Sequence, residues 1–319
     1  MTGVQTCALP ISFDEKLVEQ GRNFSNKIWN AFRLVKGWTV TDKRQPTRSD
    51  ELTVKWFEAK LNQALIEIHD HFGKFRISDA LQTIYKLIWD DFCSQYLELI
   101  KPAFDQPIDL GTYTDTVDLF ERLMQLAHPF MPFITEEIWQ QLYERQSGDS
   151  ICVAYYPHAD ADLIHAHLLT DFETLFDIIS NVRNIRNEKQ ISPKTALPLA
   201  IRTNQPETFQ PLESLIQKMA NVSDVSYANG KAGGLSFLIK GDEFFVDIAG
   251  EIDLVQEVEA TRKDLEYQIG FRDSTFKKLS NERFVANANP DVVDRERQKL
   301  ADAEAKIQAL KQRLQDLAT

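Results

Sequence analysis

The chain has 319 residues, of which 43% are hydrophobic and 26% charged, enough apolar material for two or three folded domains. Its formal charge of −12 at neutral pH excludes a protein that is basic throughout, so any nucleic-acid binding must use local patches of cations. No apolar run approaches the ~20 residues of a membrane span, and three scattered cysteines without a Cys-x-x-Cys pair favour a reducing cytoplasm over a zinc site or a disulfide framework.

The first twelve residues do not have the pattern of a signal peptide, because they lack a basic leader and a long apolar stretch. They also do not lead sensibly into the helical pattern that begins at Phe13. We therefore expect residues 1–12 to be foreign to the protein or the scar of a truncation.

The pattern from Gly21 to Lys36 predicts a helix with two different faces. One face repeats apolar residues from Phe24 to Val35 and requires a core. The opposite face carries cations, amides and one aromatic ring, which together suit a phosphate backbone and an unstacked base. A solvated surface is the competing interpretation. The polar face comprises Arg22, Asn26, Trp29, Arg33 and Lys36.

Further helical patterns follow and, with the first helix, predict an α-helical bundle over residues 13–157. Ser49 or Asp50 is expected to cap the second helix, and Ser78 the third. Pro129 and Pro132 should separate the fourth helix from the fifth. The expected ranges are 51–72, 78–101, 114–128 and 135–146.

The composition then changes, and residues 158–250 predict a long helix followed by a small α+β unit. Residues 151–157 should cross to it in an extended form, and the long helix should run from about 160 to 188. The remaining elements are expected to be a strand over 197–202, a helix over 209–220 and a hairpin of residues 235–239 with residues 244–248.

The last segment, residues 251–319, carries two seams of mainly apolar residues at three- and four-residue spacing. The first seam runs from Val255 to Leu279 and includes Phe276. The second seam runs from Val293 to Leu317. Two such helices joined by a tight connection should form an antiparallel coiled-coil hairpin about 40 Å long at 1.5 Å per residue. A coiled coil folded on itself leaves no seam for dimerisation, so we expect a monomer with an arm that reaches another molecule.

Three stretches of the bundle, residues 21–30, 92–98 and 126–139, resemble the anticodon-binding bundle of class I aminoacyl-tRNA synthetases of the valine, isoleucine and leucine group. Residues 279–300 are similar to the C-terminal tRNA-binding arm of the bacterial valine-specific members, which disfavours a relative that charges isoleucine or leucine. Residues 182–186 resemble their junction segment, and the resemblance covers residues 13–319.

The fold that this resemblance implies is mainly α. It combines an anticodon-binding helical bundle at 13–157, a small α+β junction at 158–250 and a C-terminal antiparallel coiled-coil hairpin at 251–319. The family's catalytic domain carries a His-x-Gly-His motif and a Lys-Met-Ser-Lys-Ser loop that hold ATP, and neither motif occurs in this sequence. By the same resemblance, we expect the editing domain to be absent from this sequence as well.

By the same resemblance, the whole enzyme joins valine to its tRNA with ATP and magnesium in the cytoplasm. We expect this chain to hold no catalytic residue, metal or cofactor, because ATP and Mg²⁺ belong to the missing catalytic domain. Its expected partner is tRNA(Val), with no membrane. The chain alone is expected neither to form valyl-adenylate nor to charge tRNA.

The resemblance also implies which side chains meet the tRNA, with the bundle on the anticodon stem and loop and the arm on the outer corner. The competing interpretation of Trp29 is that it packs in the core. The competing interpretation of the junction arginines is that they form structural salt bridges. In the bundle the expected contacts are Arg22, Asn23, Lys27, Trp29, Asn30 and Arg33. In the loop and the junction they are Lys43, Arg44, Arg48, Arg183 and Arg186, and in the arm they are Lys277, Lys278 and Arg283.

Two other classes of function stay open: a stand-alone RNA-binding protein without catalysis, and an interaction module whose coiled-coil hairpin binds protein. Salt-dependent tRNA binding separates the second from the RNA-binding classes. The pairs His69/His71 and His165/His167 are two residues apart on helices, so their rings point to different sides and do not indicate a metal site. His128 is interpreted as a helix-end residue rather than a base.

Overall fold

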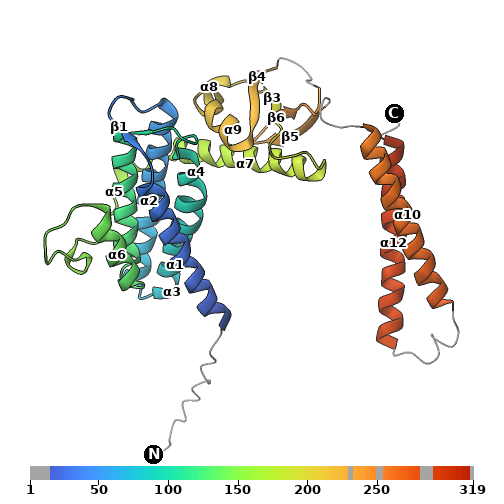
Figure 1. Ribbon diagram of the computed structural model, residues 1–319, viewed down its shortest axis with the longest axis horizontal. Helices are drawn as coiled ribbons and strands as arrows, with labels where there is room; N and C mark the ends of the chain where they lie inside the picture. Colours follow the sequence, from blue (N-terminus) through green and yellow to red (C-terminus); the bar gives the residue numbers. More distant parts are fainter. Residues whose placement is uncertain (1–14, 229–232, 249–253, 281–289, 317–319) are drawn as a thin grey trace, which may run out of the picture.

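The computed structural model describes residues 15–228, 233–248, 254–280 and 290–316 (Figure 1). The expectations for residues 1–12 and for Arg283 lie outside the described residues. Within the described part, no helix is both long and apolar enough to cross a bilayer.

The N-terminal part is a helical bundle, as predicted (Figure 1). Its first helix buries the apolar face that the sequence indicates: Phe24 is 5% exposed, and Ile28 and Val35 are fully buried. The helices are α1 (Glu15–Lys36), α2 (Arg48–Gly73), α3 (Ile77–Lys86), α4 (Leu97–Ile100), α5 (Leu110–Ala127) and α6 (Pro132–Leu142).

Several helix boundaries differ from the prediction because other side chains cap them. Thr47, not Ser49 or Asp50, is the N-cap of α2: its hydroxyl accepts from the Asp50 N–H at 3.2 Å, and the Asp50 carboxylate accepts from the Thr47 N–H at 3.0 Å. Ser78 does not cap α3, because it already lies inside the helix. Asp109 caps α5 through the Thr112 N–H at 2.8 Å, so this helix begins earlier than expected.

Between α3 and α4 the chain forms a π-helix, η1 (Leu87–Tyr96), which the sequence does not reveal. The Ser94 hydroxyl donates to the carbonyl of Trp89, five residues earlier, at 2.8 Å. Tyr96 is fully buried, and its hydroxyl lies 2.8 Å from the Thr116 hydroxyl. Because Thr116 already donates to the Thr112 carbonyl, Tyr96 is the donor in this pair.

Two short segments in the expected loops pair as parallel strands, β1 (Val40–Thr41) with β2 (Ile108–Asp109), which was not predicted. Residues 151–153 also differ from the prediction: they form a 3₁₀-helix, η2 (Ile151–Val153), instead of an extended crossing. A second 3₁₀ turn, η3 (Ala161–Leu163), precedes the long helix, which therefore begins later than expected, as α7 (Ala166–Glu188).

The middle unit is α+β, as predicted, with a four-stranded sheet in the order β4-β3-β6-β5. β3 pairs parallel with β4 and antiparallel with β6, and β5 pairs antiparallel with β6. The hairpin turn at Lys240 and Gly241 has positive φ at both residues, +50° and +99°, as a tight two-residue turn requires. The strands are β3 (Leu197–Arg202), β4 (Val222–Tyr227), β5 (Leu235–Ile239) and β6 (Asp242–Val246).

The strand β4 was not predicted, and the expected single helix over 209–220 also differs from the structure. That segment is divided into α8 (Pro206–Phe209), the 3₁₀ turn η4 (Gln210–Leu212) and α9 (Glu213–Ala220). Asn221 follows α9 in the left-handed conformation, with φ at +51°, and turns the chain directly into β4.

The helix α7 packs against both the bundle and the sheet unit (Figure 1). On the bundle side, the ring of Phe172 stacks on Trp56 of α2 with 4.9 Å between ring centroids. On the sheet side, Lys240 beyond β5 donates to the Thr174 hydroxyl of α7 at 3.1 Å. Lys218 of α9 adds a second link, because its ammonium donates to the carbonyls of Leu99 and Lys101 at 2.6 and 2.7 Å.

The last described segments are two long helices, α10 (Leu254–Leu279) and α12 (Pro290–Asp316), which lie side by side and run in opposite directions (Figure 1). Val293, Ala303 and Ile307 of α12 are buried. Among the α10 residues whose burial is described, Thr275 is buried, whereas Phe276 is 60% exposed. The prediction that placed Phe276 in the seam is therefore wrong by one residue.

Candidate nucleic-acid interface

The exposed face of α1 presents cations and amides together. Arg22, Asn23, Asn30 and Arg33 are all exposed, on the side opposite Ile28 and the other core residues. The Arg22 guanidinium lies 3.7 Å from the Glu19 carboxylate, with both side chains about two-thirds exposed. An exposed pair of this kind contributes little and is readily exchanged for a phosphate.

Lys27 and Trp29 lie at the edges of this face and have partners within the protein. The Lys27 ammonium donates to the Ser94 hydroxyl at 2.7 Å and lies 4.0 Å from the centre of the Trp89 ring. Trp29 is half-buried against the core, with its ring centroid 5.3 Å from that of Phe32. Part of the Trp29 ring therefore packs in the core, as the competing interpretation expects.

A groove of about 540 Å³ lies at the C-terminal end of α1, where α1 meets α5 and α6. One of its two cations, Arg145, lies over the Trp139 ring at 3.6 Å and is paired with Glu121 at 2.6 Å. The sequence does not reveal this groove, because it forms only when three helices meet. The polar side chains that line it are Lys36, Tyr113, Thr114, Gln140, Gln141, Tyr143, Glu144 and Arg145.

The loop before α2 holds its cations in different ways. Lys43 is exposed, and Arg48 is exposed in the first turn of α2. Arg44 instead bridges two segments: its guanidinium lies 3.8 Å from the Asp50 carboxylate and donates to the Pro107 carbonyl at 3.4 Å. Arg44 therefore links this loop to the segment before β2.

The two junction arginines lie in contrasting environments. Arg183 is exposed and donates to the Met219 carbonyl at 3.0 Å. Arg186 is only 4% exposed, and its guanidinium donates to the carbonyls of Thr195 and Asn221 at 2.6 and 2.8 Å. It also donates to the Ser192 and Ala220 carbonyls, both at 3.2 Å. The prediction that Arg186 contacts tRNA disagrees with this position, because the buried guanidinium holds backbone segments together instead.

On the helical pair, Lys277 and Lys278 are both exposed at the end of α10. The Lys278 ammonium lies 3.2 Å from the carboxylate of Glu296 on α12. Glu296 also pairs with Lys299 at 3.0 Å, and the hydrogen bonds from Lys299 and Lys278 lower the pKa of this carboxyl. Lys278 therefore ties α10 to α12 as well as presenting charge.

Two family models match the chain. The model described as the anticodon-binding domain of tRNA ligase matches residues 54–201, and the model described as the valyl tRNA synthetase tRNA binding arm matches residues 253–318. The first match covers most of the bundle and extends into β3. The second covers α10 and α12.

Curated relatives match nearly the whole chain. The valine–tRNA ligase of Christiangramia forsetii is 43% identical over 309 residues, covering 97% of this chain and 35% of that protein. The enzyme of Phocaeicola vulgatus is 46% identical over 306 residues, which cover 95% of this chain and 34% of that enzyme. The enzyme of Acinetobacter baylyi is 34% identical over 325 residues, which cover 97% of this chain and 33% of that enzyme.

This chain thus spans about a third of the length of the relatives it matches. The two matched models cover the bundle from residue 54 onward and the helical pair, whereas α1 lies before the first match. The chain belongs to the valine–tRNA ligase family and corresponds to a C-terminal portion of such an enzyme, with its anticodon-binding domain and its tRNA-binding arm.

Proposed function

We propose that this chain binds tRNA(Val) as the recognition part of a valine–tRNA ligase, acting as a monomer in the cytoplasm. The observation that carries the proposal is the polar face of α1, where Arg22, Asn23, Asn30 and Arg33 are exposed together on a chain of net charge −12. Clustered cations give an acidic protein a local site for a phosphate backbone.

The proposed contacts divide by chemistry. Arg22 and Arg33 neutralise phosphates, which positions the RNA without reading its sequence. Asn23 and Asn30 can hydrogen-bond to the edges of unstacked bases, since an amide offers both a donor and an acceptor. Lys27 orders the edge of this face through its contacts with Ser94 and Trp89.

The helical pair supplies a second contact in this proposal. α10 and α12 form an antiparallel coiled-coil hairpin, and Lys277 and Lys278 present charge to the phosphates of the outer corner of the tRNA. The match of residues 253–318 to a tRNA-binding arm supports this assignment. The whole ligase would attach valine to tRNA with ATP and Mg²⁺, and we propose that this chain alone does not charge tRNA.

The proposal is tested by measuring the binding of the chain to valine tRNA and to a non-cognate tRNA over a series of salt concentrations. Replacing Arg22 and Arg33 together with alanine is expected to weaken binding and to reduce the slope of log K against log salt by roughly 2, since each phosphate contact contributes about 0.7–0.9. The matched control is Lys55→Ala/Lys194→Ala, which removes the same charge from exposed positions elsewhere.

A second variant, Lys277→Ala/Lys278→Ala, is expected to reduce the salt slope while keeping the preference for valine tRNA, because phosphate contacts carry no sequence information. Equal loss of binding in the control variant would contradict the assignment to α1. Failure of the chain to bind any tRNA at low salt would favour the protein-interaction module instead.

A further inference from the structure

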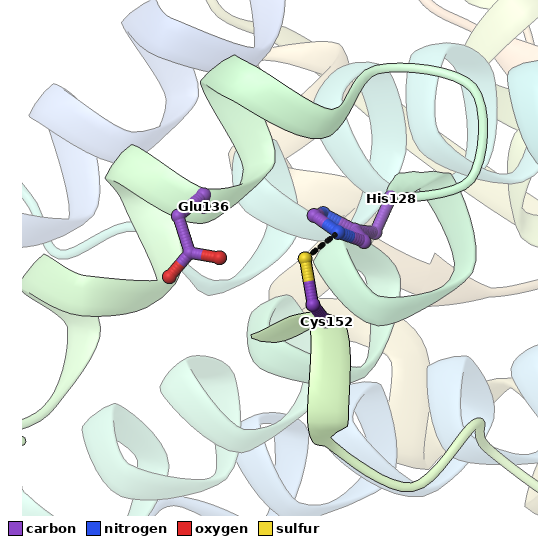
Figure 2. A group of neighbouring side chains, drawn as sticks. All are labelled: His128, Glu136 and Cys152. Carbon is purple, nitrogen blue, oxygen red and sulfur yellow. Dashed lines mark hydrogen bonds between the residues drawn. The ribbon is translucent and has the colours of Figure 1, made fainter. Parts of the chain in front are cut away.

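Three side chains with different metal-binding atoms meet where α5 ends and α6 and η2 begin (Figure 2). His128 follows α5, Glu136 lies in α6 and Cys152 lies in η2. Their ligand atoms all lie within 4.8 Å of one another, and Nε2 of His128 is 3.2 Å from Sγ of Cys152. We propose that these three side chains bind a zinc ion, a site independent of the proposed tRNA contacts.

The hydrogen bonds of His128 determine which ring nitrogen is available. The Thr135 hydroxyl donates its one hydrogen to the Met131 carbonyl at 2.8 Å. It must therefore accept from His128, whose Nδ1 lies 2.8 Å away and carries the hydrogen. In the neutral ring, the lone pair is then on Nε2, which faces the sulfur of Cys152 (Figure 2). A ligand histidine is commonly oriented in this way, by a hydrogen bond from its other nitrogen.

Glu136 positions the segment that carries the sulfur. Its carboxylate accepts from the Ser150 hydroxyl at 2.8 Å and from the Gln140 amide at 2.8 Å. Ser150 is the N-cap of η2 and accepts from the Cys152 N–H at 3.2 Å. Each oxygen of the Glu136 carboxylate accepts one of these hydrogen bonds, and the remaining lone pairs can coordinate an ion.

The separation of the His128 and Cys152 ligand atoms fits zinc with a small movement, and the Glu136 carboxylate, within 4.8 Å of both, completes the site by moving toward them. Zinc bonds of about 2.0–2.1 Å to nitrogen and 2.3 Å to sulfur in a tetrahedral site separate the two ligand atoms by about 3.6 Å. In the structure Nε2 of His128 and Sγ of Cys152 are 3.2 Å apart, so they need to open by only a few tenths of an ångström. Sulfur and imidazole ligands favour zinc over magnesium or calcium.

The exposure of Cys152 leaves the fourth zinc position to water, as in sites with three protein ligands. Binding forms a Zn–S bond, and the proton of the Cys152 thiol is released to the solvent without any change of oxidation state. The ion would join η2 to α6 and to the end of α5. The other described cysteine does not compete, because burial raises the pKa of the Cys93 thiol to about 12.

The test uses Co²⁺ as a spectroscopic probe for Zn²⁺, with the 319-residue chain in a Cys7→Ser background. We expect a sulfur-to-cobalt charge-transfer band that saturates at one equivalent and disappears when Zn²⁺ is added. Cys152→Ser should abolish the band, whereas Cys152→His should restore Zn²⁺ binding without the band. His128→Gln and Glu136→Gln should each weaken binding by roughly 10- to 100-fold or more.

The matched controls are His158→Gln and Glu137→Gln, which change exposed residues of the same types outside the cluster and should leave Zn²⁺ affinity unaltered. Zn²⁺ should also raise the thermal unfolding midpoint of the unsubstituted chain but not that of Cys152→Ser, because an ion that binds only the folded state stabilises it. A missing band, or a band of equal strength in Cys152→Ser, would overturn the proposal and leave only an S–H to Nε2 hydrogen bond.

Discussion

Replacing Arg186 with leucine is expected to lower the free energy of unfolding by roughly 3–5 kcal/mol, because it breaks the charge-assisted hydrogen bonds that this buried cation makes to four carbonyls. The guanidinium of Arg186 donates to four carbonyls, from the end of the loop after α7 and from the turn between α9 and β4. Urea unfolding followed by far-UV circular dichroism measures the change. Arg186→Lys should recover only part of the loss, since an ammonium has three donors and no planar fork.

Arg183→Leu is the matched control for this experiment, because Arg183 lies one turn earlier on α7 and makes a single exposed contact, to the Met219 carbonyl. Its effect should stay below about 1 kcal/mol. If the two variants lost the same amount of stability, the guanidinium of Arg186 would not hold these segments together.

Replacing Asp91 with asparagine is expected to stabilise the protein at about pH 8 by up to 2–3 kcal/mol. This magnitude follows from the difference between the pKa of Asp91 in the folded and the unfolded protein, at ~1.36 kcal/mol per pKa unit. Asp91 is only 6% exposed, and burial raises its pKa from 3.8 to about 6, although Lys60 and Lys86 oppose the shift. Above this value the folded protein holds a buried carboxylate, whereas the unfolded chain holds the same charge in water. Removing the charge therefore favours the folded state.

The pH dependence distinguishes this cause from better packing. Because the folded pKa is the higher one, wild-type stability falls relative to the variant as the pH rises from about 4 to about 6, and the difference is constant above that range. Chemical unfolding of both proteins across this range measures it. An equal gain for Asp91→Asn at low and high pH would contradict the titration.

The sequence predicts best those features that repeat along the chain. The apolar spacing of α1 identified Phe24, Ile28 and Val35 as core residues, and all are buried. The strands β3 and β5 are predicted equally well, because each alternates along its length and has turn residues nearby. Features that depend on a single hydrogen bond or on a distant partner were not predicted. The cap at Thr47 and the short β1–β2 pair belong to this group.

The roles of individual polar side chains also depend on distant partners and are therefore hard to predict from the sequence. The sequence placed Arg183 and Arg186 together as cations, but only the packing of the chain buries one of them among carbonyls and leaves the other exposed. The sequence correctly indicates that His128 ends a helix, but its contact with Cys152 could not be predicted, because Cys152 is distant in the sequence and reaches the ring only through the fold. Contacts between residues far apart in the sequence therefore determine which polar side chains hold the fold together and which stay exposed.

The position of α7 has a mechanical consequence. Its Phe172 is stacked on Trp56 in the bundle, while Thr174 accepts from Lys240 at the sheet hairpin, and Lys218 spans the same boundary. A hinge between the two units would have to unstack aromatic rings and break partly buried hydrogen bonds at once. The bundle and the α+β unit therefore behave as one stiff platform.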